Sequence, residues 1–169
     1  QRAVGEAVAQ AAWALGLDDG PIHAELRLTP EGPRVLEVAA RSIGGLCART
    51  LNFATGLSLE TLILAHALGL DPPLNREAQA AGVLMIPIPH AGVLRDVHTE
   101  AASAVPLIED VVITHPRARL VPLPEGASYL GFIFARGPSP AVVEAALREA
   151  HQRLEILIDV EALAEREQG

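Results

Sequence analysis

The sequence is poor in aromatic residues and cysteine, and it has no lysine. Aromatic residues make up 3% of its 169 residues, Cys47 is the only cysteine, and all 13 basic residues are arginine. Because 50% of the residues are apolar, the core must be built mainly from Leu, Val, Ile and Ala. A single cysteine excludes an internal disulfide and fits a reducing compartment, so we expect a cytoplasmic protein.

Charge and hydropathy exclude further classes of protein. No apolar run reaches the roughly 18–20 residues of a membrane span, and no signal peptide is present. The formal net charge is -8, without any Lys/Arg run, which argues against nucleic acid and anionic membranes as partners. The glycine loops of P-loop and Rossmann nucleotide sites are also absent. The chain begins at Gln1 within a helical pattern, and we therefore predict a fragment of a longer polypeptide.

The pattern of the chain changes at about residues 71–80, where Asp71-Pro72-Pro73 breaks a helical region. We predict an α+β fold in two parts. Residues 1–75 combine antiparallel strands with packed helices, and residues 80–162 form a small antiparallel β-rich domain with one long helix.

Several elements are predicted on each side of this boundary. Before it, Ser58 is a candidate N-cap of a helix that ends near Gly69, and after it Ser139-Pro140 is typical of a helix start. The expected helices are 3–15, 46–54, 59–69 and 140–154, the last with Val142, Val143, Ala146, Leu147 and Ala150 facing inward. The expected strands of the second part are 82–89, 92–97, 108–115, 119–123, 128–136 and 156–160.

Residues 22–40 predict a β-hairpin. Two apolar-rich runs flank a turn cluster of Pro and Gly, centred on Glu31. Because side chains alternate along a strand, Glu25 then lies opposite Glu37, and His23 lies opposite Ala39. The other face is apolar and is expected to pack on a core; it carries Ile22, Ala24, Leu26, Leu28, Leu36, Val38 and Ala40.

The two opposed glutamates are the most informative feature of the chain. Like charges directly across a strand pair repel, so a structural hairpin gains nothing from this arrangement. A divalent cation shared by Glu25 and Glu37 removes the conflict. The alternative is a solvated face on which the glutamates form salt bridges to Arg27 and Arg34.

The hairpin and the residues after it resemble the end of an ATP-grasp domain. The resemblance rests on Glu25 and on Glu37-Val-Ala-Ala-Arg41, which is followed by Gly44-Gly45. Ala39 stands where most of the superfamily has an asparagine metal ligand. The Glu-x-Ala-Ala-Arg form is similar to that of the bacilysin-type L-amino acid ligases, and residues 82–160 resemble the extra C-terminal domain of those carboxylate–amine ligases.

This resemblance implies an ATP-dependent ligase that forms an amide or peptide bond through an acyl phosphate. It implies Glu25 and Glu37 as ligands of two Mg2+ ions, Arg41 as a catalytic residue, and His23, Arg41, Gly44 and Gly45 as substrate-binding residues. The implied partners are ATP and small carboxylate and amine substrates, with amino acids expected for both substrates and a homodimer left open.

The same resemblance implies that the chain is incomplete as an enzyme. Such ligases hold the nucleotide phosphates with lysines of a lid, and this chain has no lysine, so it should not turn over alone. For His23 a supporting hydrogen bond is the alternative to proton transfer, and for Arg41 the alternative is an ordinary ion pair with a glutamate.

Three rival functions stay open. Two lie within the superfamily, namely the biotin-carboxylase-like enzymes and the phosphoribosylamine–glycine ligases. The third is a non-catalytic dimerisation or regulatory module that uses the hairpin only as a scaffold. A metal site at His90, His98 and His115 with Asp96 is disfavoured, because the spacing matches no zinc pattern.

Overall fold

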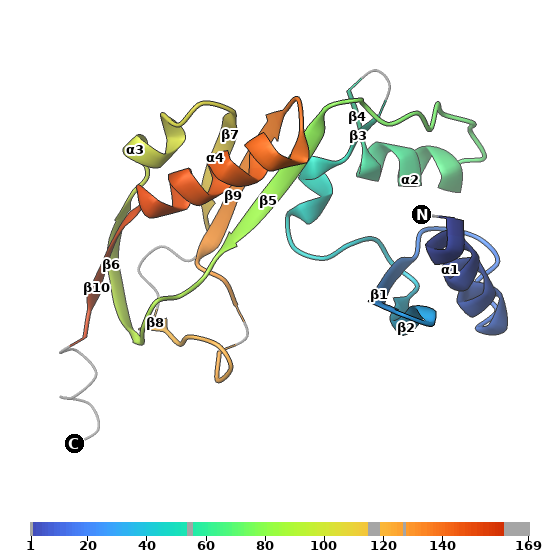
Figure 1. Cartoon of the computed structure of the whole chain (residues 1–169), viewed down its shortest axis with the longest axis horizontal. Helices are drawn as coiled ribbons and strands as arrows, with labels where there is room; N and C mark the ends of the chain where they lie inside the picture. Colours follow the sequence, from blue (N-terminus) through green and yellow to red (C-terminus); the bar gives the residue numbers. More distant parts are fainter. Residues whose placement is uncertain (1, 54–55, 115–118, 127, 161–169) are drawn as a thin grey trace. The chain divides into compact units, whose positions relative to one another are not determined.

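The computed structural model describes residues 2–53, 56–114, 119–126 and 128–160. The chain divides into two compact units, Gln1–Glu77 and Ala78–Gly169, each of which is described by itself (Figure 1). The assignment of residues 1–75 and 80–162 as two functional domains stays a prediction. Among the described residues, no helix is both long enough and apolar enough to cross a membrane.

The first unit begins with helix α1 (Arg2–Ala14), close to the predicted range. Gly16, at φ 68°, ends it. The Leu17 N–H donates to the Ala12 carbonyl oxygen and the Gly16 N–H to that of Trp13, each at 3.0 Å, which is the Schellman pattern of a helix end. Trp13, near the end of this helix, is 79% exposed.

Strands β1 (His23–Thr29) and β2 (Gly32–Ala39) form the predicted hairpin, and α1 packs on β2 (Figure 1). Thr29 pairs with Gly32, so the turn contains only Pro30 and Glu31 rather than three residues centred on Glu31. The ladder then skips Leu36, which forms a β-bulge: Leu26 pairs with Val35, whereas Glu25 pairs with Glu37.

This bulge changes the predicted apolar face. Beyond it, Leu26 shares a face with Val35 rather than with Leu36, because directly opposed residues point the same way. Leu28 and Leu36 are 74% and 62% exposed within this unit. The prediction that the whole apolar face packs on a core is therefore wrong for these two residues.

The rest of the first unit is short elements. The predicted helix 46–54 is only a four-residue 3-10 helix, because Asn52 and Phe53 instead pair with Leu57 and Ser58 across a turn. The predicted cap at Ser58 is confirmed, since its Oγ accepts the Thr61 N–H at 3.2 Å. The elements are η1 (Cys47–Thr50), β3 (Asn52–Phe53), β4 (Leu57–Ser58) and α2 (Leu59–Ala67).

The second unit contains two three-stranded antiparallel sheets, with strand orders β5-β9-β7 and β10-β6-β8. Helix α4 lies along β5 and β9 (Figure 1). The short helix α3 was not predicted. The elements are β5 (Ala80–Ile86), β6 (Gly92–His98), α3 (Glu100–Ser103), β7 (Ile108–Ile113), β8 (Arg119–Leu120), β9 (Gly131–Gly137), α4 (Pro140–Gln152) and β10 (Glu155–Asp159).

Helix α4 covers the first of these sheets closely. A Cβ built on Gly82 would lie 2.9 Å from Leu147 Cδ1 and from Val143 Cγ1, so a glycine is needed beneath the helix. Four of the five residues predicted to face inward are buried, but Val142 is 40% exposed. The predicted α+β class, with antiparallel strands and one long helix in the second part, is confirmed.

Candidate functional site

The glutamate pair lies on the hairpin of the first unit. Glu25 of β1 and Glu37 of β2 are direct partners in the antiparallel ladder, as the sequence predicted, and they therefore share a face. Both side chains are more than half exposed, at 57% and 53%. Two carboxylates thus face solvent side by side, and neither is committed to a buried salt bridge.

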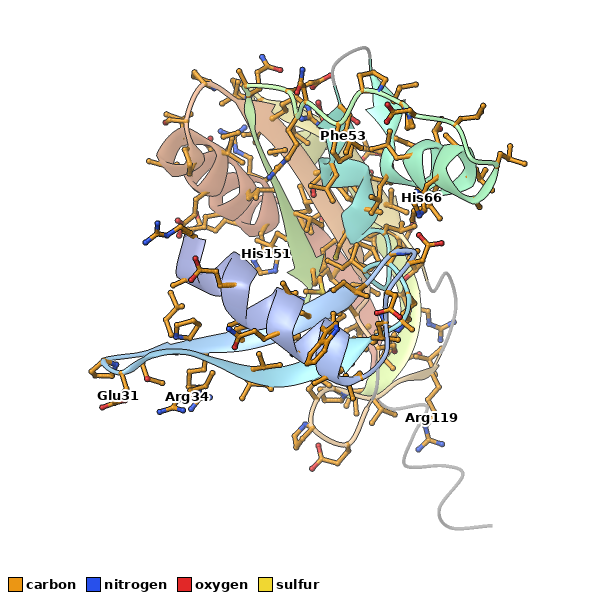
Figure 2. The ribbon with its side chains drawn as sticks, turned by 90° about the vertical axis from the view of Figure 1, so that its right-hand side faces the viewer. Glu31, Arg34, Phe53, His66, Arg119 and His151 are labelled. Atoms are coloured by element: carbon orange, nitrogen blue, oxygen red, sulfur yellow. The ribbon has the colours of Figure 1, made fainter. Side chains whose placement is uncertain are left out.

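Arg27 and Arg34 do not neutralise this pair. They oppose each other in the ladder, between the glutamates and the turn. Figure 2 labels Glu31 and Arg34 at the hairpin tip, and the glutamate pair lies further along the strands. Two side chains do approach the pair: His23 of β1 lies beside Glu25, and Arg41, which follows β2, lies beside Glu37.

His23 opposes Ala39 in the ladder and lies two residues before Glu25 on the same strand face. Its Nε2 is 3.4 Å from Glu25 Oε1. Its side chain is 21% exposed, so the imidazole is much more enclosed than the carboxylate that it contacts. The predicted supporting hydrogen bond matches this geometry, and the predicted contact with substrate stays a prediction.

Arg41 follows the end of β2. Its Nη1 donates to the Ser42 carbonyl oxygen at 3.0 Å, and its Nη2 is 3.8 Å from Glu37 Oε1. At that distance, and with both groups more than half exposed, the ion pair contributes little to stability. The guanidinium is thus held near the glutamate pair without forming a close ion pair with it. A catalytic role for Arg41 stays a prediction.

Gly44 and Gly45 continue the site along the chain. A Cβ built on Gly44 would lie 3.9 Å from Arg41 Nη1, which places this glycine beside the guanidinium. Gly45 has φ 63°, a left-handed conformation that favours glycine. The predicted long helix after them is absent, since the backbone forms only η1 there.

The residues fit a hard divalent cation that takes only part of its ligands from protein. Mg2+ prefers about six oxygen ligands and usually binds through one or two carboxylates, with phosphate and water completing the set. Within the described ranges, no group of three or more His, Cys, Asp and Glu side chains could hold a metal. His115, a member of the disfavoured histidine cluster, lies outside the described residues.

A separate apolar pocket of about 480 Å³ lies in the first unit, and none of the predicted site residues lines it. Its labelled members Phe53 and His66 come from β3 and α2 (Figure 2). His66 Nε2 is 2.7 Å from Asp19 Oδ1, a contact that the sequence did not suggest because 47 positions separate the two residues. The pocket has apolar walls and no carboxylate pair, so we place the chemistry at the hairpin. The lining residues are Gly20, Pro21, Phe53, Leu59, Leu62, Ile63, His66, Leu70, Asp71, Pro72 and Leu74.

Comparisons with known sequences each match about half of the chain. Residues 84–159 match the family model of the L-amino acid ligase C-terminal domain 2. Over 86 residues the chain is 37% identical to carnosine synthase 1 of Gallus gallus, a stretch that covers 48% of this chain and 9% of that protein.

Solved structures extend the similarity to nearly the whole chain. The L-amino acid ligase from Bacillus licheniformis matches 93% of this chain with a TM-score of 0.76 and 29% identity. Phosphoribosylglycinamide synthetase from Anaerococcus prevotii matches 90% with a TM-score of 0.68, but at 15% identity it shows only a shared fold. In both cases the chain spans 40% of the length of the solved relative.

Proposed function

We propose that this chain is the C-terminal part of an ATP-grasp ligase and that it supplies the metal-binding face for ATP-dependent formation of an amide or peptide bond. In the proposed reaction, ATP phosphorylates a substrate carboxylate. The amine of a second substrate then displaces phosphate from the acyl phosphate. We propose amino acids as substrates, because relatives of this chain are an L-amino acid ligase and a carnosine synthase.

The observation that carries the proposal is the direct opposition of Glu25 and Glu37 on an exposed strand face. When bound, Mg2+ would neutralise phosphate charge during transfer, and these two carboxylates would hold it. We propose two ions, with Glu37 as the carboxylate that would contact both. Ala39 offers no oxygen ligand, so water or phosphate would complete the coordination.

Arg41 supports the transfer step. Its guanidinium is permanently charged and carries planar donors that match phosphoryl or carboxylate oxygens. Nη1 donates to the Ser42 carbonyl oxygen and Nη2 lies 3.8 Å from Glu37 Oε1, so we propose that the remaining N–H donors would contact a phosphoryl group. Charge that develops there would be stabilised by a group already in place.

The test is phosphate release from ATP by the ligase that carries this chain, screened against pairs of amino acids. Release should require two amino acids, and Glu37→Gln should lower its rate by at least about 10²-fold, as loss of a transition-state charge contact does. Arg34→Gln is the matched control, since Arg34 lies on the same hairpin near the turn. The absence of amino-acid-dependent release with every pair would contradict the proposal.

The space for the amine substrate beside the proposed site depends on the residue at position 45. We propose that its missing side chain leaves space for a larger amine substrate. Because φ is 63° there, Gly45→Trp adds backbone strain of about 1–2 kcal/mol as well as bulk, and Gly45→Asn adds the smaller residue that best tolerates this conformation. A shift towards smaller amines with tryptophan, but not with asparagine, would support the idea. Equal amine preference in both variants would refute it.

The chain on its own should not turn over. The proposed nucleotide site needs cationic groups on the ATP phosphates, and the chain offers arginine but no lysine for this purpose.

A biotin-carboxylase-like or purine-ligase activity predicts phosphate release with bicarbonate or phosphoribosylamine instead of two amino acids. A non-catalytic module predicts no release under any of these conditions.

A further inference from the structure

His23 is the most enclosed of the charged or polar groups around the glutamate pair. Its side chain is 21% exposed, against 57% for Glu25, 53% for Glu37 and 55% for Arg41. An enclosed side chain has few alternative rotamers, whereas an exposed carboxylate has many. Where two such groups are in contact, the enclosed side chain limits the rotamers of the exposed one.

The neighbour across the hairpin explains why the imidazole can lie there. His23 is paired with Ala39, and opposed Cβ atoms in a ladder are about 4.5–5.5 Å apart. A methyl group at position 39 leaves room beside it for a ring from the other strand. Because residues two apart share a face, this ring lies directly next to Glu25, and its Nε2 approaches Glu25 Oε1 to 3.4 Å.

We propose that His23 is a positioning residue, which holds Glu25 in the orientation that binds the metal. The inference rests on the metal site of the proposed function and deepens it. The His23 contact occupies Oε1 of Glu25 and leaves Oε2 to face the ion. Arg41 does not do the same for Glu37, because its Nη1 is bound to the Ser42 carbonyl and its Nη2 is 3.8 Å away.

Such outer partners of a metal ligand have a measurable signature. Their loss typically costs 10–100-fold in metal affinity or activity, although the ligand itself is intact. A residue that contacts the amino acid substrate would instead change the KM for that substrate. The two roles of His23 therefore separate into two different readouts.

The experiment uses Mn2+ as the probe, bound with ATP to the ligase that carries this chain, with affinity measured by electron paramagnetic resonance. His23→Phe keeps a ring but removes the donor, and we expect Mn2+ to bind about 10–100-fold more weakly with little change in amino acid KM. His23→Gln restores an N–H donor and should recover most of the affinity. Arg34→Gln, on the same hairpin, should bind Mn2+ like the wild type, and circular dichroism of each variant checks its folding.

Three results would overturn the inference. Wild-type Mn2+ affinity in both His23 variants would show that Glu25 needs no support. A raised amino acid KM with unchanged Mn2+ affinity would assign His23 to the substrate instead. If Glu37→Gln also binds Mn2+ as tightly as the wild type, the metal site itself is wrong, and the proposed function fails with it.

Discussion

The two units of the chain bury very different amounts of apolar surface. Eighteen apolar residues are buried among the described residues; three of them, Ala12, Ala48 and Leu62, lie in the first unit and the other fifteen lie in the second. The two units are nevertheless similar in length. The first unit, which carries the proposed chemistry, is thus organised mainly by strand pairing and helix caps, whereas the second has a core of its own.

The glycines show the same difference. In the first unit, Gly16, Gly32 and Gly69 take positive φ and have no atom within 4 Å of a built Cβ, so they serve turns. In the second unit, Gly82 and Gly131 have neighbours closer than 3 Å, so they serve close packing. Backbone conformation shapes the first unit, and contact between elements shapes the second.

The largest expected effect comes from separating the units. Residues 78–160 expressed alone should unfold in one cooperative thermal transition, because their core is complete. Residues 1–77 alone should show none, since three buried apolar residues cannot offset the entropy of ordering the chain. Calorimetry of the two peptides measures this. A cooperative transition in residues 1–77 would break the contrast between the units.

Truncating an apolar side chain should lower the free energy of unfolding mainly when the side chain lies in the second unit. Ile133 is fully buried, so Ile133→Ala should lower the free energy of unfolding by about 2–5 kcal/mol through the lost contacts and the cavity left behind. Leu28, on the hairpin, is 74% exposed, and Leu28→Ala should change stability by no more than about 0.5 kcal/mol. Urea denaturation of the whole chain compares them, and equal costs would contradict the difference in burial.

Adding a methyl group should have opposite effects in the two units. A Cβ on Gly131 would lie 2.1 Å from the Val112 carbonyl oxygen, so Gly131→Ala should cost about 1–3 kcal/mol or more by forcing β7 and β9 apart. Gly5, within α1, has nothing within 4 Å, so Gly5→Ala should stabilise that helix by about 0.5–1 kcal/mol. Thermal unfolding followed by circular dichroism gives both signs, and a loss of stability with Gly5→Ala would be contrary evidence.

The helix cap of the first unit should have a smaller effect. Ser58 Oγ accepts the Thr61 N–H, so Ser58→Ala should cost about 1 kcal/mol. Ser139 lies at the same position of α4 but makes no side-chain cap hydrogen bond. Ser139→Ala therefore serves as the control, with an expected loss of stability of at most about a few tenths of a kcal/mol. Hydrogen exchange at Thr61 reports the first change. Equal effects of the two substitutions would show that the cap bond is unimportant.

The smallest effect is a titration at the edge of the second unit. A hydrogen bond from His98 to Glu155, its cross-strand partner, raises the pKa of this histidine above 6.5, and Asp96 and Glu100 add to the effect. The stabilisation of the folded state by this contact is present below pH 6.5. It is lost as the pH rises through the raised pKa of His98, because the protonated histidine makes the contact. NMR titration should show this pKa fall towards 6.5 in Glu155→Gln; no change would remove Glu155 as its cause.

The sequence predicted the parts of the structure that depend on short-range signals. Ser58 and Gly69 mark the ends of α2, and Ser139-Pro140 marks the start of α4. The pairing of Glu25 with Glu37 is also as predicted, although a two-residue turn and a bulge produce it in place of the predicted turn centred on Glu31. The resemblance to the L-amino acid ligases was predicted from Glu37-Val-Ala-Ala-Arg41 and its glycines, and it agrees with the family model over residues 84–159 and with the solved L-amino acid ligase.

The failures depend on contacts that no local pattern reports. The helix predicted from residue 46 stops at Thr50 because Asn52 and Phe53 find strand partners after Gly56. Val142 fits a helical apolar pattern, yet it is 40% exposed, since burial depends on which neighbour covers the face. The contact of His66 with Asp19 joins distant segments, and only the fold brings them together.

The bulge at Leu36 has a consequence for engineering the hairpin. A two-residue turn followed by regular pairing would set Glu25 opposite Leu36 and leave the two carboxylates on opposite faces. The bulged residue shifts the alignment of the two strands by one position between the turn and the glutamates. The pairing near the turn therefore does not by itself fix the pairing of the glutamates. Pro30-Glu31 is therefore a natural insertion point for a tag or a reporter peptide, because the alignment of the glutamate pair is restored downstream of it.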